Sequence, residues 1–198
     1  MSERWIIIAA SAPSESSTLR VYLWRNLRGL GAHYLQPSVC LLPERPEVIR
    51  RVARLAERVR REGGELRLLH VRLDAPGEEV ALIGAFRAER AEEYAEVCSR
   101  TPAFLEELAA EQARGRLTYA EVEESEADLA RLRAWLAKIE ARDYFDAPGR
   151  GEAEAAVEEC AGALSEFAAA ALAAEAPAPT TGPSPGAAPA RRLRTVEE

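Results

Sequence analysis

Trp5-Ile6-Ile7-Ile8-Ala9-Ala10 is the stretch of this chain that decides the fold of its N-terminal part. The run is apolar without alternation, which predicts a β-strand buried on both faces at the centre of its sheet. The pair Ala12-Pro13 follows closely and predicts the end of that strand. The sequence around this strand must therefore supply neighbouring strands and cover for two apolar faces.

The segments that follow have the order β-α-β-β-α-β. A helix is capped by Ser16-Ser17-Thr18 and carries leucines at helical spacing: Leu19, Leu23, Leu27 and Leu30. Two short strands at 33–36 and 39–42 precede a helix that begins near Pro46 and ends at Gly63-Gly64. With a last strand at 66–73, the pattern predicts a ferredoxin-like α+β domain over residues 1–75. We expect the helical extension or a second copy of the chain to cover the open face of the sheet.

Residues 76–175 predict an acidic, all-helical extension. The first helix is expected to break at Ser99–Pro102 and to restart with Thr101 as its cap. Thr118 and Glu121 form a capping box for the next helix, whose apolar residues have coiled-coil spacing: Val122, Leu129, Leu132, Leu136 and Ile139. A similar spacing follows in the last helix: Ala153, Val157, Cys160, Leu164, Phe167 and Ala171. These two seams predict an antiparallel helical hairpin, and the composition of 176–198 predicts a disordered Pro/Ala-rich tail.

The charge is unevenly distributed. The whole chain carries −7, but residues 1–72 hold 13 arginines against 7 glutamates, whereas residues 73–176 hold 10 basic against 24 acidic side chains. Opposed halves either attract each other or leave the basic part with its own anionic partner. No apolar run approaches the roughly 20 residues of a membrane span, and the N-terminus lacks the pattern of a signal peptide. We therefore expect a cytoplasmic protein without a membrane partner.

The residues suited to metal binding or catalysis are few and scattered. The soft metal ligands are His33, His70, Cys40, Cys98 and Cys160, and no two of them share a short spacing. Aspartates are scarce, and no serine sits in a nucleophile motif. The sequence therefore predicts no metal site, no cofactor and no catalytic residue, and we expect the protein not to be an enzyme.

Basic residues on the two N-terminal helices are the more informative feature. On the second helix a stripe lies opposite the apolar face: Arg50, Arg54, Arg58 and Arg61. On the first helix three residues share another face: Arg20, Trp24 and Arg28. Guanidinium groups bind phosphate through paired donors, so these seven residues are the candidate contacts to duplex DNA. The same pattern also fits a solvated helix face, or one neutralised by the acidic half.

Two stretches of the chain closely resemble the N-terminal domain of the ChrB chromate-resistance regulators. The first comprises LRVYLWRNLRGLGA at 19–32 and SVCLLP at 38–43. The second comprises WLAKIEARDYF at 135–145 and APGR at 147–150, similar to the aromatic-rich turn between late helices in that family. The likeness covers roughly residues 5 to 170, with order and spacing kept.

The resemblance implies a DNA-binding transcriptional regulator linked to chromate resistance. It also implies a ferredoxin-like core, as in PaaX-type repressors and Cas2-like proteins. Those proteins carry an aspartate at the end of the first strand, whereas this chain has Ala10-Ser11-Ala12-Pro13, which disfavours nuclease activity. Family members typically continue into a C-terminal domain, which weakens the expectation of chromate sensing here. A homodimer and a chromate or other oxyanion effector stay open as partners, and a protein-interaction module without DNA binding is the alternative function.

Overall fold

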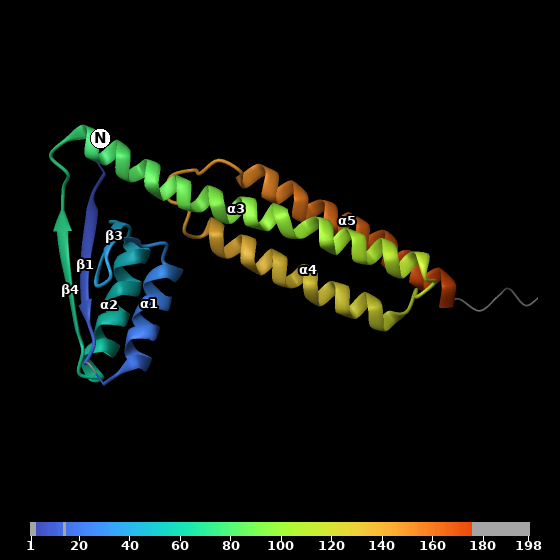
Figure 1. The fold of residues 1–198 in the computed structure, drawn as a ribbon, viewed down its shortest axis with the longest axis horizontal. Coiled ribbons are helices and arrows are strands. Elements are labelled where there is room, and N and C mark those ends of the chain that lie inside the picture. The colour runs from blue at the N-terminus through green and yellow to red at the C-terminus, as the bar shows by residue number, and fades with distance from the viewer. Residues whose placement is uncertain (1–2, 14, 176–198) are drawn as a thin grey trace, which may run out of the picture.

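The computed structural model describes residues 3–13 and 15–175 of the chain, and they form two joined parts (Figure 1). A four-stranded sheet with two helices makes up the N-terminal part, and three long helices make up an elongated bundle. The expected tail at 176–198 lies outside the described residues. Among the described residues, no helix combines the length and apolar character needed to cross a bilayer.

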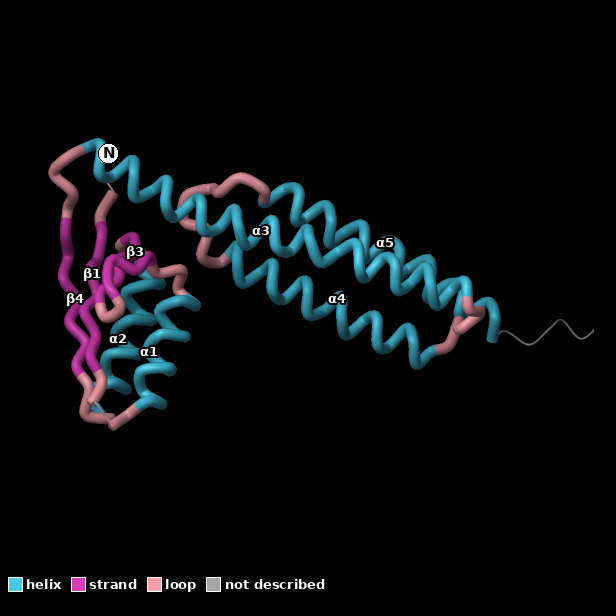
Figure 2. Tube along the Cα trace, in the orientation of Figure 1, coloured by secondary structure: helices cyan, strands magenta, loops and turns pink. Residues whose placement is uncertain are grey.

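The sheet confirms the predicted α+β class. Its strands are β1 (Trp5–Ser11), β2 (His33–Gln36), β3 (Val39–Pro43) and β4 (Glu65–Val71), in the spatial order β2-β3-β1-β4. Each neighbouring pair is antiparallel, so β1 lies centrally as its apolar run predicts. The helices α1 (Ser17–Gly29) and α2 (Pro46–Arg61) lie side by side on one face (Figures 1 and 2). This strand order and helix placement are those of a ferredoxin-like domain.

The main core of this part lies between the sheet and the two helices. The strands contribute Ile6, Ile8, Cys40 and Leu42, and the helices contribute seven aliphatic side chains: Leu19, Leu23, Leu27, Val48, Val52, Leu55 and Val59. The Ser16 side chain accepts a hydrogen bond from the Leu19 amide and so caps α1, as expected. Helix α2 ends where Gly63 adopts φ +78°, a conformation that favours glycine.

The second face of the sheet is covered at one end by aromatic packing. Trp5 and Leu41 meet Phe86, which lies on the third helix, α3 (Pro76–Ala113). Ring centroids of Trp5 and Phe86 are 5.6 Å apart, and Phe145 is equally close to Trp5. The helical extension therefore supplies part of the cover that the apolar strand requires, while Leu69 of β4 stays exposed.

Helix α3 is continuous, and the predicted break at Ser99–Pro102 is wrong. A proline inside a helix removes one amide donor, which here leaves the Cys98 carbonyl without its usual partner. The buried Thr101 hydroxyl donates to that carbonyl over 3.0 Å and replaces the missing hydrogen bond. Thr101 thus keeps the helix continuous past Pro102 and does not cap a new helix.

The bundle contains the predicted antiparallel hairpin. Helix α4 (Tyr119–Glu140) begins at Thr118, whose hydroxyl accepts from the Glu121 amide as the capping box requires. Helix α5 (Arg150–Glu175) returns alongside it, and α3 completes a three-helix bundle (Figure 2). All six seam residues predicted on α5 are buried, and four of the five on α4 are.

Charged and aromatic side chains join the bundle to the sheet domain. Glu93 on α3 receives two hydrogen bonds from Arg142, which follows α4, and its Oε2 lies 2.8 Å from Nε of the buried Arg90. Tyr144 donates to the Leu30 carbonyl at the end of α1, over 2.8 Å. We call Arg90, Glu93, Arg142 and Tyr144 the junction cluster.

Candidate nucleic-acid interface

The α2 arginine row, defined as Arg50, Arg54, Arg58 and Arg61, lies on the solvent side of its helix. The opposite side of α2 is buried against the sheet through four residues: Val48, Val52, Leu55 and Val59. Helical periodicity therefore fixes the exposure of the row, because residues three and four apart share a face. All four arginines are exposed, as the sequence pattern predicts.

The charge of this row is only partly compensated. Arg58 donates to Glu62 over 2.8 Å, and its guanidinium lies 3.7 Å from the centre of the Tyr22 ring. Hydrogen bonding to Glu62 raises the pKa of Arg58, so the group stays charged. Within residues 3–13 and 15–175, no carboxylate lies within 4 Å of Arg50, Arg54 or Arg61. The acidic bundle does not neutralise the row, because it extends away from the α1/α2 layer (Figure 1).

A polar cleft of about 250 Å³ between α1 and α2 extends this surface. Tyr22 and Asn26 line it from α1, and Arg51 and Arg54 line it from α2. The Asn26 side chain donates to the Tyr22 carbonyl over 2.8 Å, which fixes its orientation. Tyr22 and Asn26 were not among the sequence candidates, although their spacing of four residues places them on one side of α1.

The three candidates on α1 lie on its other side, which we call the α1 flank. There, Arg20 and Trp24 line a second cavity, together with residues of the turn between β2 and β3. The Arg28 guanidinium lies 5.3 Å from the centre of the Trp24 ring, and the Trp24 side chain is about half exposed. The structure therefore separates the seven predicted residues into the α2 arginine row and the α1 flank.

The histidines and cysteines do not converge in the part of the chain that the structure describes. His33 Nδ1 lies 2.7 Å from Glu89, and His70 Nδ1 lies 3.1 Å from Glu44. Burial raises the pKa of the Cys40 thiol to about 12, so it remains neutral near pH 7. No group of three or more histidine, cysteine or acidic side chains could hold a metal among the described residues.

Comparison with known proteins identifies the family. The profile described as "Protein ChrB, N-terminal" matches residues 20–178. This chain belongs to the ChrB N-terminal family. A member of known sequence, Protein ChrB of Cupriavidus metallidurans, is 32% identical over 92 residues, which cover 46% of this chain and 28% of that protein. No solved structure matches the chain. The family match includes both the α1/α2 layer and the bundle, so the predicted resemblance is confirmed.

Proposed function

We propose that this chain is a non-catalytic regulatory protein that binds duplex DNA and takes part in chromate resistance. The observation that carries the proposal is the exposure of three arginines that have no carboxylate partner among the described residues: Arg50, Arg54 and Arg61. Binding of such groups to phosphates releases counterions and supplies a favourable free energy that does not depend on base sequence. Membership of the ChrB N-terminal family supports the link to chromate resistance.

The cleft between α1 and α2 adds groups of a second type to this surface. Asn26 carries an amide with both donors and acceptors, and Tyr22 presents a ring beside the Arg58 guanidinium. Phosphate contacts fix the position of a protein on DNA, whereas base contacts select the sequence. We assign the positioning contacts to the α2 arginine row. Asn26 lines the same cleft as Arg54 and carries the amide group that we assign to contact with a base edge.

Titration of a labelled duplex of about 30 base pairs, followed by fluorescence anisotropy, tests the proposal. Between 50 and 200 mM salt, log K should fall against log salt with a slope of about −3 to −4, as expected for four phosphate contacts. The double variant Arg54→Glu/Arg58→Glu should bind every sequence at least about tenfold more weakly. Arg116→Glu, in the turn between α3 and α4, is the matched control and should bind as the parent does.

Two outcomes would contradict DNA binding through this surface. One is the absence of any complex at 50 mM salt. The other is equal weakening by the double variant and by the Arg116 control, because the turn between α3 and α4 that contains Arg116 lies at the end of the bundle far from α2 (Figure 1). Circular dichroism of each variant checks that the helices are retained.

Protein docking by the bundle is the second candidate function. A groove of about 350 Å³ between α3 and α4 has an apolar base formed by Phe104, Leu132 and Trp135 and a rim of charged residues. Apolar grooves with polar rims are typical of protein contacts. If this is the function, the anisotropy of the labelled duplex should not change on addition of the protein at low salt. The full chain should still bind a protein partner through this groove.

A further inference from the structure

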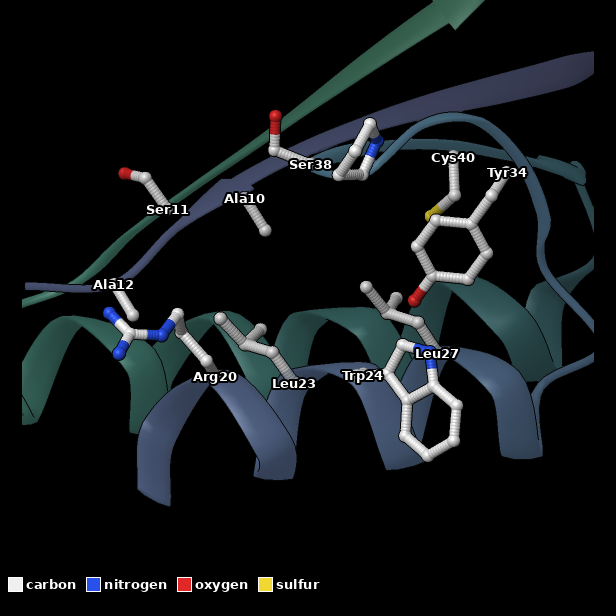
Figure 3. A pocket seen from close by; sticks show the side chains of 11 residues that line it. Ala10, Ser11, Ala12, Arg20, Leu23, Trp24, Leu27, Tyr34, Ser38 and Cys40 are labelled. Carbon is white, nitrogen blue, oxygen red and sulfur yellow. The ribbon is translucent and has the colours of Figure 1, made fainter. Parts of the chain in front are cut away.

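A cavity of about 430 Å³ lies on the α1 flank, separate from the α2 arginine row. Its walls come from the end of β1, from α1 and from the turn between β2 and β3 (Figure 3). Leu23 and Leu27 of α1 form one side, and Ala10 of β1 faces Leu23 across the space. A volume of this size is typical of sites for small organic molecules.

The lining is mostly apolar, with the hydroxyl groups of Ser11, Ser38 and Tyr34 and one positive charge. Arg20 is the only charged side chain among the described residues that line the cavity, and none of them is acidic. Burial raises the pKa of Tyr34 and of Cys40 to about 12, so both groups are neutral at physiological pH. The field inside the cavity therefore favours an anion over a cation or a zwitterion.

The charge and the apolar surface lie at different places in the cavity. Figure 3 shows the Arg20 guanidinium at the Ala12 end and the Tyr34 ring at the opposite end. Arg20 also donates to the Pro13 carbonyl over 3.2 Å, which holds the guanidinium at this end. The exposed indole of Trp24 lies on the same helix one turn from Arg20. An occupant must therefore have an anionic end and a body that tolerates aliphatic and aromatic neighbours.

We propose that this cavity binds a small organic monocarboxylate with a flat apolar body. The carboxylate pairs with Arg20, and the body lies between Ala10 and Leu23 and extends towards Tyr34. Charge-assisted hydrogen bonds to a guanidinium orient the carboxylate, and burial of the apolar body supplies the remaining free energy. The proposal is independent of DNA binding.

The same lining disfavours a tetrahedral inorganic oxyanion. Such an ion presents oxygens in every direction, and each buried oxygen without a donor costs free energy. The side of the cavity formed by Ala10, Leu23 and Leu27 offers no side-chain donor. This side of the cavity therefore favours the apolar body of an aromatic carboxylate over ions such as sulfate or chromate.

Titration of the full chain with 2-naphthoate, followed by calorimetry and by tryptophan fluorescence, tests the proposal. Saturable binding with one site is expected, and Trp24 should report it because Trp5 and Trp135 do not line this cavity. The neutral analogue 2-naphthalenemethanol should bind at least about tenfold more weakly, because it lacks the charge that pairs with Arg20. Sulfate in excess should not displace the naphthoate beyond its effect on ionic strength.

Three variants assign the binding to the cavity. Arg20→Gln should weaken 2-naphthoate at least about tenfold, whereas Arg20→Lys keeps the charge and should retain most of the affinity. Ala10→Leu narrows the cavity and should reduce binding of 2-naphthoate more than binding of the smaller acetate. The matched control is Arg87→Gln, since Arg87 is exposed on α3 and does not line the cavity.

The proposal is overturned if 2-naphthoate does not bind, or if Arg20→Gln and Arg87→Gln bind it equally well. Equal affinity for 2-naphthoate and its alcohol would also overturn it, because charge would then play no part. Arg20 is exposed on the surface of α1, so its replacement leaves the core leucines in place. None of these measurements contains DNA, so their failure is distinguishable from failure of the proposed DNA binding.

Discussion

The arginines of the bundle and the arginines of α2 differ in whether a carboxylate already neutralises them. Between residues 76 and 175, eight of nine arginines have a carboxylate oxygen within 4 Å. Helix α2 has six arginines, and of these only Arg58 has a carboxylate oxygen of a described residue within 4 Å. The two regions therefore differ less in arginine content than in how many of their arginines are paired with a carboxylate.

The spacing of charges along each helix accounts for part of this difference. In the bundle, acidic residues lie three or four positions from an arginine, as in Glu96 with Arg100 and Arg150 with Glu154. On α2, Arg50, Arg54 and Arg58 follow one another at intervals of four. Glu47 and Glu57 lie three positions from Arg50 and Arg54, but in the described part of the chain neither carboxylate is within 4 Å of them. Like charges at intervals of four repel, so the α2 arginine row costs stability in the absence of a bound anion.

Removal of Glu93 should produce the largest change in stability. Arg90 is buried and Arg142 nearly so, and both contact Glu93 in the junction cluster. Glu93→Ala should lower the free energy of unfolding by about 3 kcal/mol, because the buried Arg90 guanidinium loses its nearer carboxylate and Arg142 loses its own. Glu96→Ala, which removes the exposed partner of Arg100, should cost less than about 0.5 kcal/mol. Urea unfolding compares the two, and similar losses would show that burial of the pair is unimportant.

A carboxylate placed within the α2 arginine row should pair with a neighbouring arginine, as the carboxylates of the bundle helices do. Arg50→Gln should reduce the salt slope of DNA binding by about one unit, since one phosphate contact is lost. Arg50→Glu also places an acid four residues before Arg54 and should reduce the slope by about two. Its affinity should be roughly tenfold below that of Arg50→Gln, a difference of about 1.4 kcal/mol. Equal slopes for the two variants would contradict the role given to unpaired arginines.

Two side-chain hydroxyl groups on α3 donate to backbone carbonyls, one in a buried place and one in an exposed place. They test whether burial raises the cost of losing a hydrogen bond between uncharged groups. Thr101 is buried and donates to the Cys98 carbonyl, whereas Ser99 is exposed and donates to the Glu96 carbonyl. Thr101→Val should lower the free energy of unfolding by about 1 kcal/mol, because the carbonyl beside Pro102 loses its donor. Ser99→Ala should cost less, since water can replace the hydroxyl. Thermal unfolding followed by circular dichroism at 222 nm separates the two.

Reversal of one charge in the α2 arginine row should give the smallest change in the free energy of unfolding. This change should be a gain. Arg54→Glu replaces two like-charge pairs, with Arg50 and with Arg58, by two opposite-charge pairs and adds one like-charge pair with Glu57. The net change should raise the free energy of unfolding by about 0.5 kcal/mol at low salt. The gain should disappear at about 1 M salt, where the interactions are screened. The same variant weakens DNA binding in our proposal, so stability and affinity should change in opposite directions. A loss of stability at low salt would contradict the repulsion described for this row.

Most of the fold follows from patterns that act locally. The unbroken apolar run of β1 predicts its central place, and the caps at Ser16 and Thr118 are both formed. The continuity of α3 was missed because Pro102 ordinarily ends or bends a helix. The hydroxyl of the preceding Thr101 satisfies the affected carbonyl, and local composition does not reveal that this rotamer is adopted.

The candidate surfaces are predicted less completely, because they depend on the neighbours of each helix. The solvent exposure of the α2 arginine row follows from helical periodicity, and the structure confirms it. Periodicity does not reveal which lateral side of α1 faces α2, so Tyr22 and Asn26 were missed. For the same reason Arg20, Trp24 and Arg28 were grouped with the α2 arginines, although they line or border a separate cavity.

The 38 residues of α3 belong to both parts of the molecule at once. Phe86 packs into the aromatic cluster on the sheet, while Phe104 and Leu108 on the same helix pack into the bundle. A helix of this length extends roughly 57 Å, and Thr101 keeps it intact past Pro102. Helix α3 therefore connects the two parts as a continuous helix, not as a flexible linker. The distal tip of the bundle is held several nanometres from the sheet, at a separation fixed by the rise of one helix.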